Sequence, residues 1–264
     1  MRIAIITPVF NGLAYLNHVL CSVRSQRFTD LEYIVCDGGS TDGSRDLLEE
    51  NRYWISKLIF EKDSGMYDAL VKGFRHATGD VLGWINSDDL LMPWCLDCVA
   101  EYFDKVPECQ WLTGVPSLID AKGRMIWTAP VAPRYRRTWI RRGWYSGIGL
   151  GPIQQESTFF RRSLYEKVGG INPRFRLAGD FDLWRRFAEH ADLHQLGTVI
   201  AGFRMHGKNL TANPQRYFEE AGARRIPGGK VLGALYSFLA FLAFRVRKSP
   251  RFDYMALRDL KRGL

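Results

Sequence analysis

The first ninety residues of the chain alternate short β-branched runs with longer amphipathic stretches. The β-branched runs predict strands over residues 2–7, 31–37, 57–61 and 81–86. The amphipathic stretches predict helices over residues 13–26, 44–50 and 66–76. Strands and helices that alternate in this way build successive βαβ units on a parallel sheet. We therefore expect an α/β fold with a mostly parallel, Rossmann-like central sheet flanked by helices.

The pattern loosens after Pro93. There we expect a helix, antiparallel strands around 111–116 and 125–129, an irregular loop over 130–153 and a helix over 180–190. The polar clusters of the chain follow the predicted strands directly. In an open α/β sheet ligands bind at the carboxyl ends of the strands, so this edge is the expected site.

The net charge of +9 is concentrated at one end of the chain. Residues 224–264 hold ten Lys and Arg against two acidic residues, whereas the rest holds 27 against 26. This distribution indicates a local partner such as an anionic membrane surface, and it argues against a nucleic-acid groove. We expect two units, a main α/β domain over 1–210 and a basic, apolar C-terminal helical tail over 211–264.

The tail contains a fourteen-residue apolar run over 231–244, bounded by basic residues. A membrane-spanning helix needs about 20 apolar residues, so the run predicts an interfacial helix instead. The alternative is a helix that packs on the domain or on a second subunit, and in the second case the protein would be an oligomer. The apolar stretch before Thr7 is too short for a signal peptide. We therefore expect a cytoplasmic protein, peripheral at the cytoplasmic face of the inner membrane.

Five cysteines form no even framework, which predicts reduced thiols in that compartment. Cys95 and Cys98 have the spacing of half a zinc site, but no second pair of ligands lies nearby in the sequence. Structural thiols are the favoured interpretation.

Acidic residues gather in four clusters, over residues 37–42, 61–65, 86–89 and 179–182. Carboxylates that meet at one sheet edge repel each other, and a bound cation explains such an arrangement economically. Asp88 follows a strongly apolar strand, and hard divalent cations prefer oxygen ligands that they share with diphosphate. The alternative is that Asp88 or Asp89 caps the helix after Pro93.

Two further acids have a functional and a structural interpretation. Asp37 ends a strand before a Gly-Gly-Ser-Thr-Asp-Gly turn. Its carboxylate could accept a hydrogen bond from a uracil imide N–H or a ribose hydroxyl, or the turn could be an ordinary tight loop. Asp180 opens an amphipathic helix, where it could act as a general base on an acceptor hydroxyl or complement the helix dipole. Trp184, one turn further on, could stack on the acceptor or belong to the core.

Six segments together resemble the ordered motifs of bacterial family 2 glycosyltransferases, which have the GT-A fold. They are residues 7–12, 37–44, 61–73, 83–89, 154–160 and 179–184. The resemblance implies transfer of a sugar, with inversion, from a nucleotide-diphosphate sugar such as a UDP-sugar to an acceptor hydroxyl. It also implies a divalent cofactor, Mn²⁺ or Mg²⁺, and a role in envelope polysaccharide or glycolipid synthesis, with a sugar or lipid-linked sugar as acceptor.

The resemblance also assigns residues to roles. The nucleotide pocket is expected to contain Thr7, Pro8, Val9, Asn11, Asp37, Asp63 and Ser87. The metal is assigned to Asp88, with His206 as a further ligand or phosphate contact and Arg204 as a neutralising charge. For His206 and Arg204 the alternative is a surface strand end with solvated basic groups. The catalytic base is Asp180, and the acceptor is expected to contact Gln155 and Trp184.

The chain departs from the family pattern at three positions, with Asn86, Gly179 and Val71 where Asp, Glu and Asn are common. Two other functions remain open, a non-catalytic nucleotide-sugar-binding protein and a sugar nucleotidyltransferase. The second would favour a basic phosphate loop after the first strand, and residues 7–12 contain no basic residue.

Overall fold

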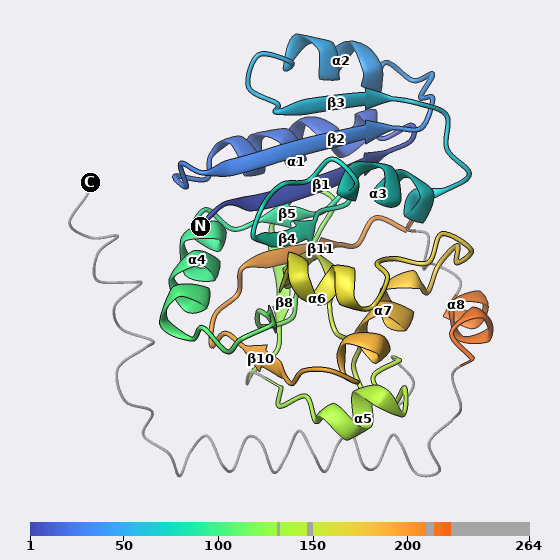
Figure 1. Cartoon of the computed structure of the whole chain (residues 1–264). Helices are drawn as coiled ribbons and strands as arrows, with labels where there is room; N and C mark the ends of the chain where they lie inside the picture. The colour runs from blue at the N-terminus through green and yellow to red at the C-terminus, as the bar shows by residue number, and fades with distance from the viewer. Residues whose placement is uncertain (131–132, 147–149, 208, 210–213, 223–264) are drawn as a thin grey trace.

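The computed structural model describes residues 1–130, 133–146, 150–207, 209 and 214–222 (Figure 1). Its main sheet has seven strands in the order β10-β6-β9-β4-β1-β2-β3. The strands are β1 (Ile3–Val9), β2 (Leu31–Asp37), β3 (Lys57–Phe60), β4 (Val81–Trp84), β6 (Trp111–Thr113), β9 (Thr158–Arg161) and β10 (Leu193–Gln195). The β1/β2, β2/β3, β1/β4 and β6/β10 pairs are parallel, and β9 runs antiparallel between β4 and β6. The expected mostly parallel sheet is confirmed.

Both faces of the main sheet are covered by helices. The helices are α1 (Leu13–Arg24), α2 (Ser44–Glu50), α3 (Met66–Phe74), α4 (Cys95–Lys105), α5 (Arg137–Arg141), α6 (Arg162–Lys167), α7 (Gly179–Phe187) and α8 (Pro214–Glu220), with a 3-10 turn η1 (Gln155–Ser157). Every residue of β1 is buried, and its side chains alternate between two cores. Ile3 and Ile5 join the core with α1 and α4, while Ala4 and Ile6 join the core with α3 and α7. A central strand buried on both faces explains the continuous apolar run in the sequence.

A second sheet brings the later part of the chain to the carboxyl edge of β4. Its order is β5-β11-β7-β8, with β5 (Leu90–Leu91), β11 (Ala201–Arg204), β7 (Ser117–Ile119) and β8 (Met125–Thr128). The antiparallel pair of β5 and β11 joins Leu91 to Ala201 and Leu90 to Gly202. Residues just before β5 and residues just after β11 therefore lie together, although the sequence separates them widely.

The strands expected around 111–116 and 125–129 form, but they do not pair with each other. β6 joins the main sheet between β9 and β10, and β8 pairs with β7 in the second sheet. These strands have three or four residues, so local propensity cannot choose their partners and long-range packing decides. Helix α8 lies beyond the expected boundary at 210, and its Tyr217, together with Ala221 just after the helix, packs on Phe181 of α7.

The cysteines are all free thiols. Cys95 is fully buried at the start of α4, and burial raises its pKa well above the usual range. Across the residues that the structure describes, no group of three or more His, Cys, Asp or Glu side chains could hold a metal ion.

The part of the chain with described coordinates contains no helix of the length and hydropathy that crossing a membrane requires. The apolar run over 231–244 lies outside the described residues.

Candidate active site

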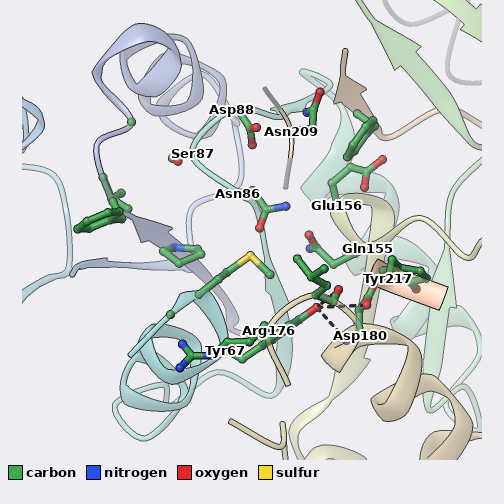
Figure 2. Close-up of a pocket in the computed structure, with 18 of the residues that line it drawn as sticks. Tyr67, Asn86, Ser87, Asp88, Gln155, Glu156, Arg176, Asp180, Asn209 and Tyr217 are labelled. Atoms are coloured by element: carbon green, nitrogen blue, oxygen red, sulfur yellow. Dashed lines mark hydrogen bonds between the residues drawn. The ribbon is translucent and has the colours of Figure 1, made fainter. Parts of the chain in front are cut away.

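A cavity of about 1100 Å³ opens at the carboxyl ends of β1, β3 and β4 (Figure 2). Its walls come from the loops that follow these strands, from the η1 turn, from the start of α7 and from α8. The cavity contains four carboxyl groups and three basic side chains, namely Asp63, Asp88, Glu156, Asp180, Lys62, Arg176 and His206. In the view of Figure 2, Asp88 and Asp180 lie toward opposite ends, with Asn86, Gln155 and Glu156 between them.

Five of the seven residues assigned to the nucleotide line this cavity, namely Pro8, Val9, Asn11, Asp63 and Ser87. Asn11 joins two of the loops, because its Oδ1 accepts from the Thr41 N–H at 2.9 Å and its own N–H donates to Ser40 Oγ at 2.8 Å. Its φ of 50° is left-handed, which Asn tolerates better than most residues. The β1 and β2 loops are thus held as one wall.

The other two residues lie behind this wall. Thr7 is fully buried, does not line the cavity, and accepts a hydrogen bond from the Tyr33 hydroxyl at 3.0 Å. Its observed role is to join β1 to β2. Asp37 is 2% exposed and uses Oδ1 to accept from the N–H groups of Gly39 and Ser40. Its Oδ2 is buried with no hydrogen-bond partner among the described residues.

Asp37 does not line the cavity itself, but Gly38, the next residue in the sequence, does. A Cβ at Gly38 would lie 2.0 Å from Asp63 Oδ2, so only glycine allows the Asp63 carboxylate to pack there. Burial raises the pKa of Asp63, and the charges of Asp68 and Asp37 add to this effect. Two carboxylates in this position leave acceptors for the N–H or O–H groups of a ligand.

Asp88 and His206 meet at one end of the cavity. Asp88 Oδ2 lies 2.9 Å from His206 Nε2, and the side chains are 28% and 9% exposed. The His206 ring stacks on Tyr15, with ring centroids 4.9 Å apart, and its backbone N–H donates to Asn209 Oδ1 at 3.2 Å. A carboxylate oxygen and an imidazole nitrogen at one point form a donor set that suits a divalent cation with open positions.

Arg204 has a structural role instead of the expected contact with diphosphate. Its side chain is fully buried and donates from Nε to the Asp88 carbonyl, and from Nη1 to the carbonyls of Asp120 and Ala121 at 3.2 and 3.0 Å. Its guanidinium also lies over the Tyr15 ring at 4.7 Å. Arg204 therefore holds the segment that presents Asp88.

The interpretation of Asp88 or Asp89 as a helix cap is wrong. α4 begins at Cys95 with Trp94 at its N-cap, and no side chain caps it. Asp89 is fully buried, and its carboxylate accepts from the Arg204 N–H at 2.8 Å and from Asn86 Nδ2 at 3.2 Å. Burial raises the pKa of Asp89 well above its usual range.

Asp180 lies in the first turn of α7, partly exposed to the cavity. The Tyr67 hydroxyl lies 3.2 Å from Asp180 Oδ1 and accepts from the Asp180 N–H at 3.2 Å (Figure 2). Burial raises the pKa of Asp180 to about 6, although hydrogen bonds to the Phe181 N–H and to Tyr67 favour the charged form. A carboxylate with a pKa near the working pH is suited to take a proton.

The start of α7 is held by α8. Glu220 accepts from the backbone N–H groups of Arg176, Leu177 and Ala178, the last two at 2.6 and 3.1 Å. Asp182 faces away from this arrangement and pairs with Arg186 at 2.7 Å. Asp180 is therefore the carboxylate that α7 presents to the cavity.

Gln155 and Trp184, the two residues assigned to the acceptor, lie in different places. Gln155 lines the cavity and donates from Nε2 to the Trp84 carbonyl at 2.6 Å. Trp184 is 2% exposed and stacks between Trp84 and Trp111, with ring centroids 5.6 Å from each. The core interpretation of Trp184 is the one that the structure supports.

Glu156, to which the sequence motifs assign no role, lies between the two ends of the cavity (Figure 2). Glu156 is 3% exposed, and its Oε1 has no hydrogen-bond partner among the described residues. Burial raises its pKa to about 8, and the nearby charges of Asp180 and Asp88 contribute. The signal was present, because Glu156 stands in the 154–160 motif, but its burial depends on the fold.

We expect Glu156→Gln to stabilise the protein at alkaline pH. A carboxyl whose pKa is raised by folding stabilises the folded state fully below its unfolded pKa, and that stability is lost as pH rises toward about 8. The neutral amide avoids this loss, so the gain near pH 8 should be on the order of 4 kcal/mol and should vanish near pH 4. Urea unfolding of both proteins at the two pH values measures it. An equal difference at both pH values would contradict a buried, protonated Glu156.

A family model described as glycosyl transferase family 2 matches residues 4–169. The chain belongs to this family. Among its relatives, an uncharacterized glycosyltransferase of Nostoc sp. is 29% identical over 79% of this chain and 66% of its own length. The chondroitin synthase of Escherichia coli is 24% identical over 79% of this chain, and the match spans only 30% of that enzyme. An uncharacterized glycosyltransferase of Mycobacterium tuberculosis is 29% identical over 89% of both chains.

Solved structures share the fold of this family 2 chain. The S. aureus TarS 1-349 structure in complex with UDP-GlcNAc has a TM-score of 0.66 at 16% identity, over 92% of this chain and 73% of that chain. The mannosyltransferase PcManGT from Pyrobaculum calidifontis, in complex with GDP-Man and Mn²⁺, has a TM-score of 0.62 at 18% identity, over 98% and 79%. The expected GT-A fold is confirmed.

Proposed function

We propose that this family 2 protein transfers a sugar, with inversion, from a nucleotide-diphosphate sugar to an acceptor hydroxyl. The observation that carries the proposal is that Asp180, with its raised pKa, and the Asp88–His206 pair line one cavity large enough for a ligand of this size. The nucleotide sugars bound to TarS and PcManGT support the class of donor. A UDP-sugar is the donor that we propose, with the base beside Asp37 and Asp63.

The reaction requires one displacement at the anomeric carbon. The acceptor oxygen forms a bond to this carbon while the bond to the diphosphate oxygen breaks, and Asp180 takes the acceptor proton. Tyr67 and the Glu220-held turn position the Asp180 carboxylate. Attack on the face opposite the leaving group inverts the anomeric configuration.

Asp88 and His206 would hold the divalent cation, Mn²⁺ or Mg²⁺, with its other positions open to oxygens of the donor. When bound, such a cation offsets the negative charge that develops on the leaving diphosphate. The Mn²⁺ in the PcManGT complex supports this choice of cofactor. Asn86 in place of an acid leaves Asp88 as the main carboxylate ligand.

We propose Gln155 as an acceptor contact and a sugar or lipid-linked sugar as the acceptor, in polysaccharide or glycolipid synthesis. The bacterial relatives and the basic, apolar composition of 224–264 support this setting and a peripheral position at a cytoplasmic membrane face. Sedimentation of the full chain with anionic vesicles, compared with a chain that ends before residue 224, tests the contribution of the tail. A full chain that stays in the supernatant would contradict it.

We expect kcat/KM to fall tenfold per pH unit below about 6, because Asp180 must be deprotonated to act as a base. Tyr67→Phe should move this acid limb to higher pH, since it removes a hydrogen bond that favours the charged carboxylate. Initial rates measured across pH 5 to 8 at saturating Mn²⁺ check both statements. If the acid limb of the kcat/KM profile lies at the same pH in Tyr67→Phe as in the parent, the titrating group is not Asp180.

The function itself is tested by a screen of nucleotide sugars for hydrolysis or transfer, with Mn²⁺, with Mg²⁺ and with chelator. Metal-dependent turnover of one donor that is lost in Asp180→Asn supports the proposal. Nucleotide binding without turnover under any condition would favour the non-catalytic binding protein. Release of diphosphate from a nucleoside triphosphate and a sugar phosphate would favour the nucleotidyltransferase.

A further inference from the structure

The near-neutral charge of the main body conceals two regions of opposite charge. Between Asp120 and Glu156 the sequence contains seven Lys and Arg and no acidic residue. The rest of the body, over 1–120 and 156–223, contains twenty Lys and Arg against 26 Asp and Glu. A net +7 segment therefore stands against a remainder of −6, and the total alone hides this separation.

The structure gathers three of these seven basic residues around α5, beside Arg185 of α7, in an exposed region that we call the α5 patch. The patch consists of Arg136, Arg141, Arg142 and Arg185, with Trp139 and Trp144 between them. All four arginines are exposed and both tryptophans are partly exposed. The Arg136 guanidinium lies 5.0 Å from the Trp139 ring centroid, and that of Arg142 lies 5.6 Å from Trp144. Within the described residues, none of the four arginines forms an ion pair with an acid.

The α5 patch is built on a rigid support. Ile140 is 2% exposed in the core, and Arg137 donates to the carbonyls of Ala188 and Glu189 at 2.7 and 2.9 Å. Arg185 Nε donates to the Arg141 carbonyl at 3.2 Å, which joins α5 to α7 (Figure 1). The ion pair that α5 forms in the described structure joins Arg137 to Asp192 at 3.9 Å, and Arg137 is not one of the four arginines.

Four guanidinium groups held together without an acidic counterpart repel each other, and an anionic partner removes this cost. Arginines alternate with tryptophans here, and half-exposed indoles are typical of the headgroup region of a bilayer. Each basic residue near an anionic lipid surface contributes to binding. We propose that the α5 patch is a docking surface for an anionic phospholipid bilayer.

The position of the α5 patch gives the docking a consequence that goes beyond the proposed reaction. Ser146 and Pro152, which follow the patch in the sequence, both line the cavity. The Tyr135 hydroxyl, one residue before the patch, donates to the Pro152 carbonyl at 3.4 Å. α7 carries both Arg185 and Asp180. An anionic bilayer attracts the α5 patch and repels the rest of the body, which has a net charge of −6. The protein is therefore oriented with the α5 side of the cavity toward the lipid surface.

The experiment is cosedimentation of the full chain with vesicles of phosphatidylcholine alone or mixed with phosphatidylglycerol. The test variant is Arg136→Glu/Arg141→Glu/Arg142→Glu. We expect it to lose at least about tenfold in partitioning to the mixed vesicles. A matched control, Arg24→Glu/Arg27→Glu/Arg75→Glu, changes the net charge equally at exposed arginines elsewhere and should lose much less.

Circular dichroism of each variant verifies folding, and Arg136→Lys/Arg141→Lys/Arg142→Lys should retain most of the binding. Equal loss in the test and control variants would show that total charge or the tail alone decides binding, and would overturn the proposal. Equal binding of the parent chain to neutral and mixed vesicles would overturn it also. If the test variant loses binding to heparin but not to vesicles, the patch takes an anionic glycan and the lipid assignment is wrong.

Discussion

Asp180→Asn is expected to lower the rate of sugar transfer by about 10³-fold, because an amide cannot take the proton of the acceptor hydroxyl. The carboxylate is presented to the cavity at the first turn of α7, beside the Tyr67 hydroxyl at 3.2 Å. Donor affinity should change little, since the proposed nucleotide residues lie on other loops. Steady-state rates with a turned-over donor and titration of the nucleoside diphosphate measure the two quantities.

Asp182→Asn is the matched control on the same helix turn. It removes a partly exposed pair with Arg186, which contributes about 1 kcal/mol, and it should leave the rate nearly unchanged. Asp180→Asn should not reduce the melting temperature, because burial already disfavours the charged carboxylate in the folded state. An Asp180→Asn protein that keeps parental turnover would remove the assignment of the base.

The second large effect is expected from Asp88→Ala. Loss of the carboxylate that lies 2.9 Å from His206 Nε2 should lower metal-dependent turnover by about 10² to 10³-fold. It should also abolish the increase in nucleoside diphosphate affinity that Mn²⁺ produces, because the shared ligand is gone. Calorimetric titrations with Mn²⁺ and with chelator measure this difference without reference to turnover.

Asp97→Ala provides the control for Asp88→Ala, since Asp97 is an exposed acid in the first turn of α4 and does not line the cavity. Its turnover and its Mn²⁺ response should match those of the parent. If Asp88→Ala retained a Mn²⁺-dependent gain in nucleotide affinity, the cation would be held by other groups and the proposed site would be wrong.

The fold of the first ninety residues could be read from the sequence because its signals are local. Period-two and period-3.6 patterns depend only on neighbouring residues, and β1, β2 and α2 lie where those patterns predicted them. The short strands β10 and β11 carry no such pattern. Their places depend on pairing with β6 and with β5 and β7, which distant parts of the chain supply.

The candidate site divides in a similar way. Asp88 and Asp180 could be chosen because each carboxylate follows a strand or opens a helix in a recognisable motif. Glu156 was missed, and Arg204 was given a ligand contact, because burial decides both roles. Arg204 looks like a free cation in the sequence, but the structure encloses it beneath Tyr15 with backbone carbonyls as acceptors.

The sequence by itself determined the family, the parallel core and the edge of the sheet where the acids gather, since short-range patterns and motif order carry that information. Only the tertiary structure decided that His206 reaches Asp88, that Trp184 belongs to the core and that Glu156 lies buried in the cavity. The physical reason is that these outcomes depend on which distant segments pack together, and packing removes water from some polar groups while leaving similar ones exposed.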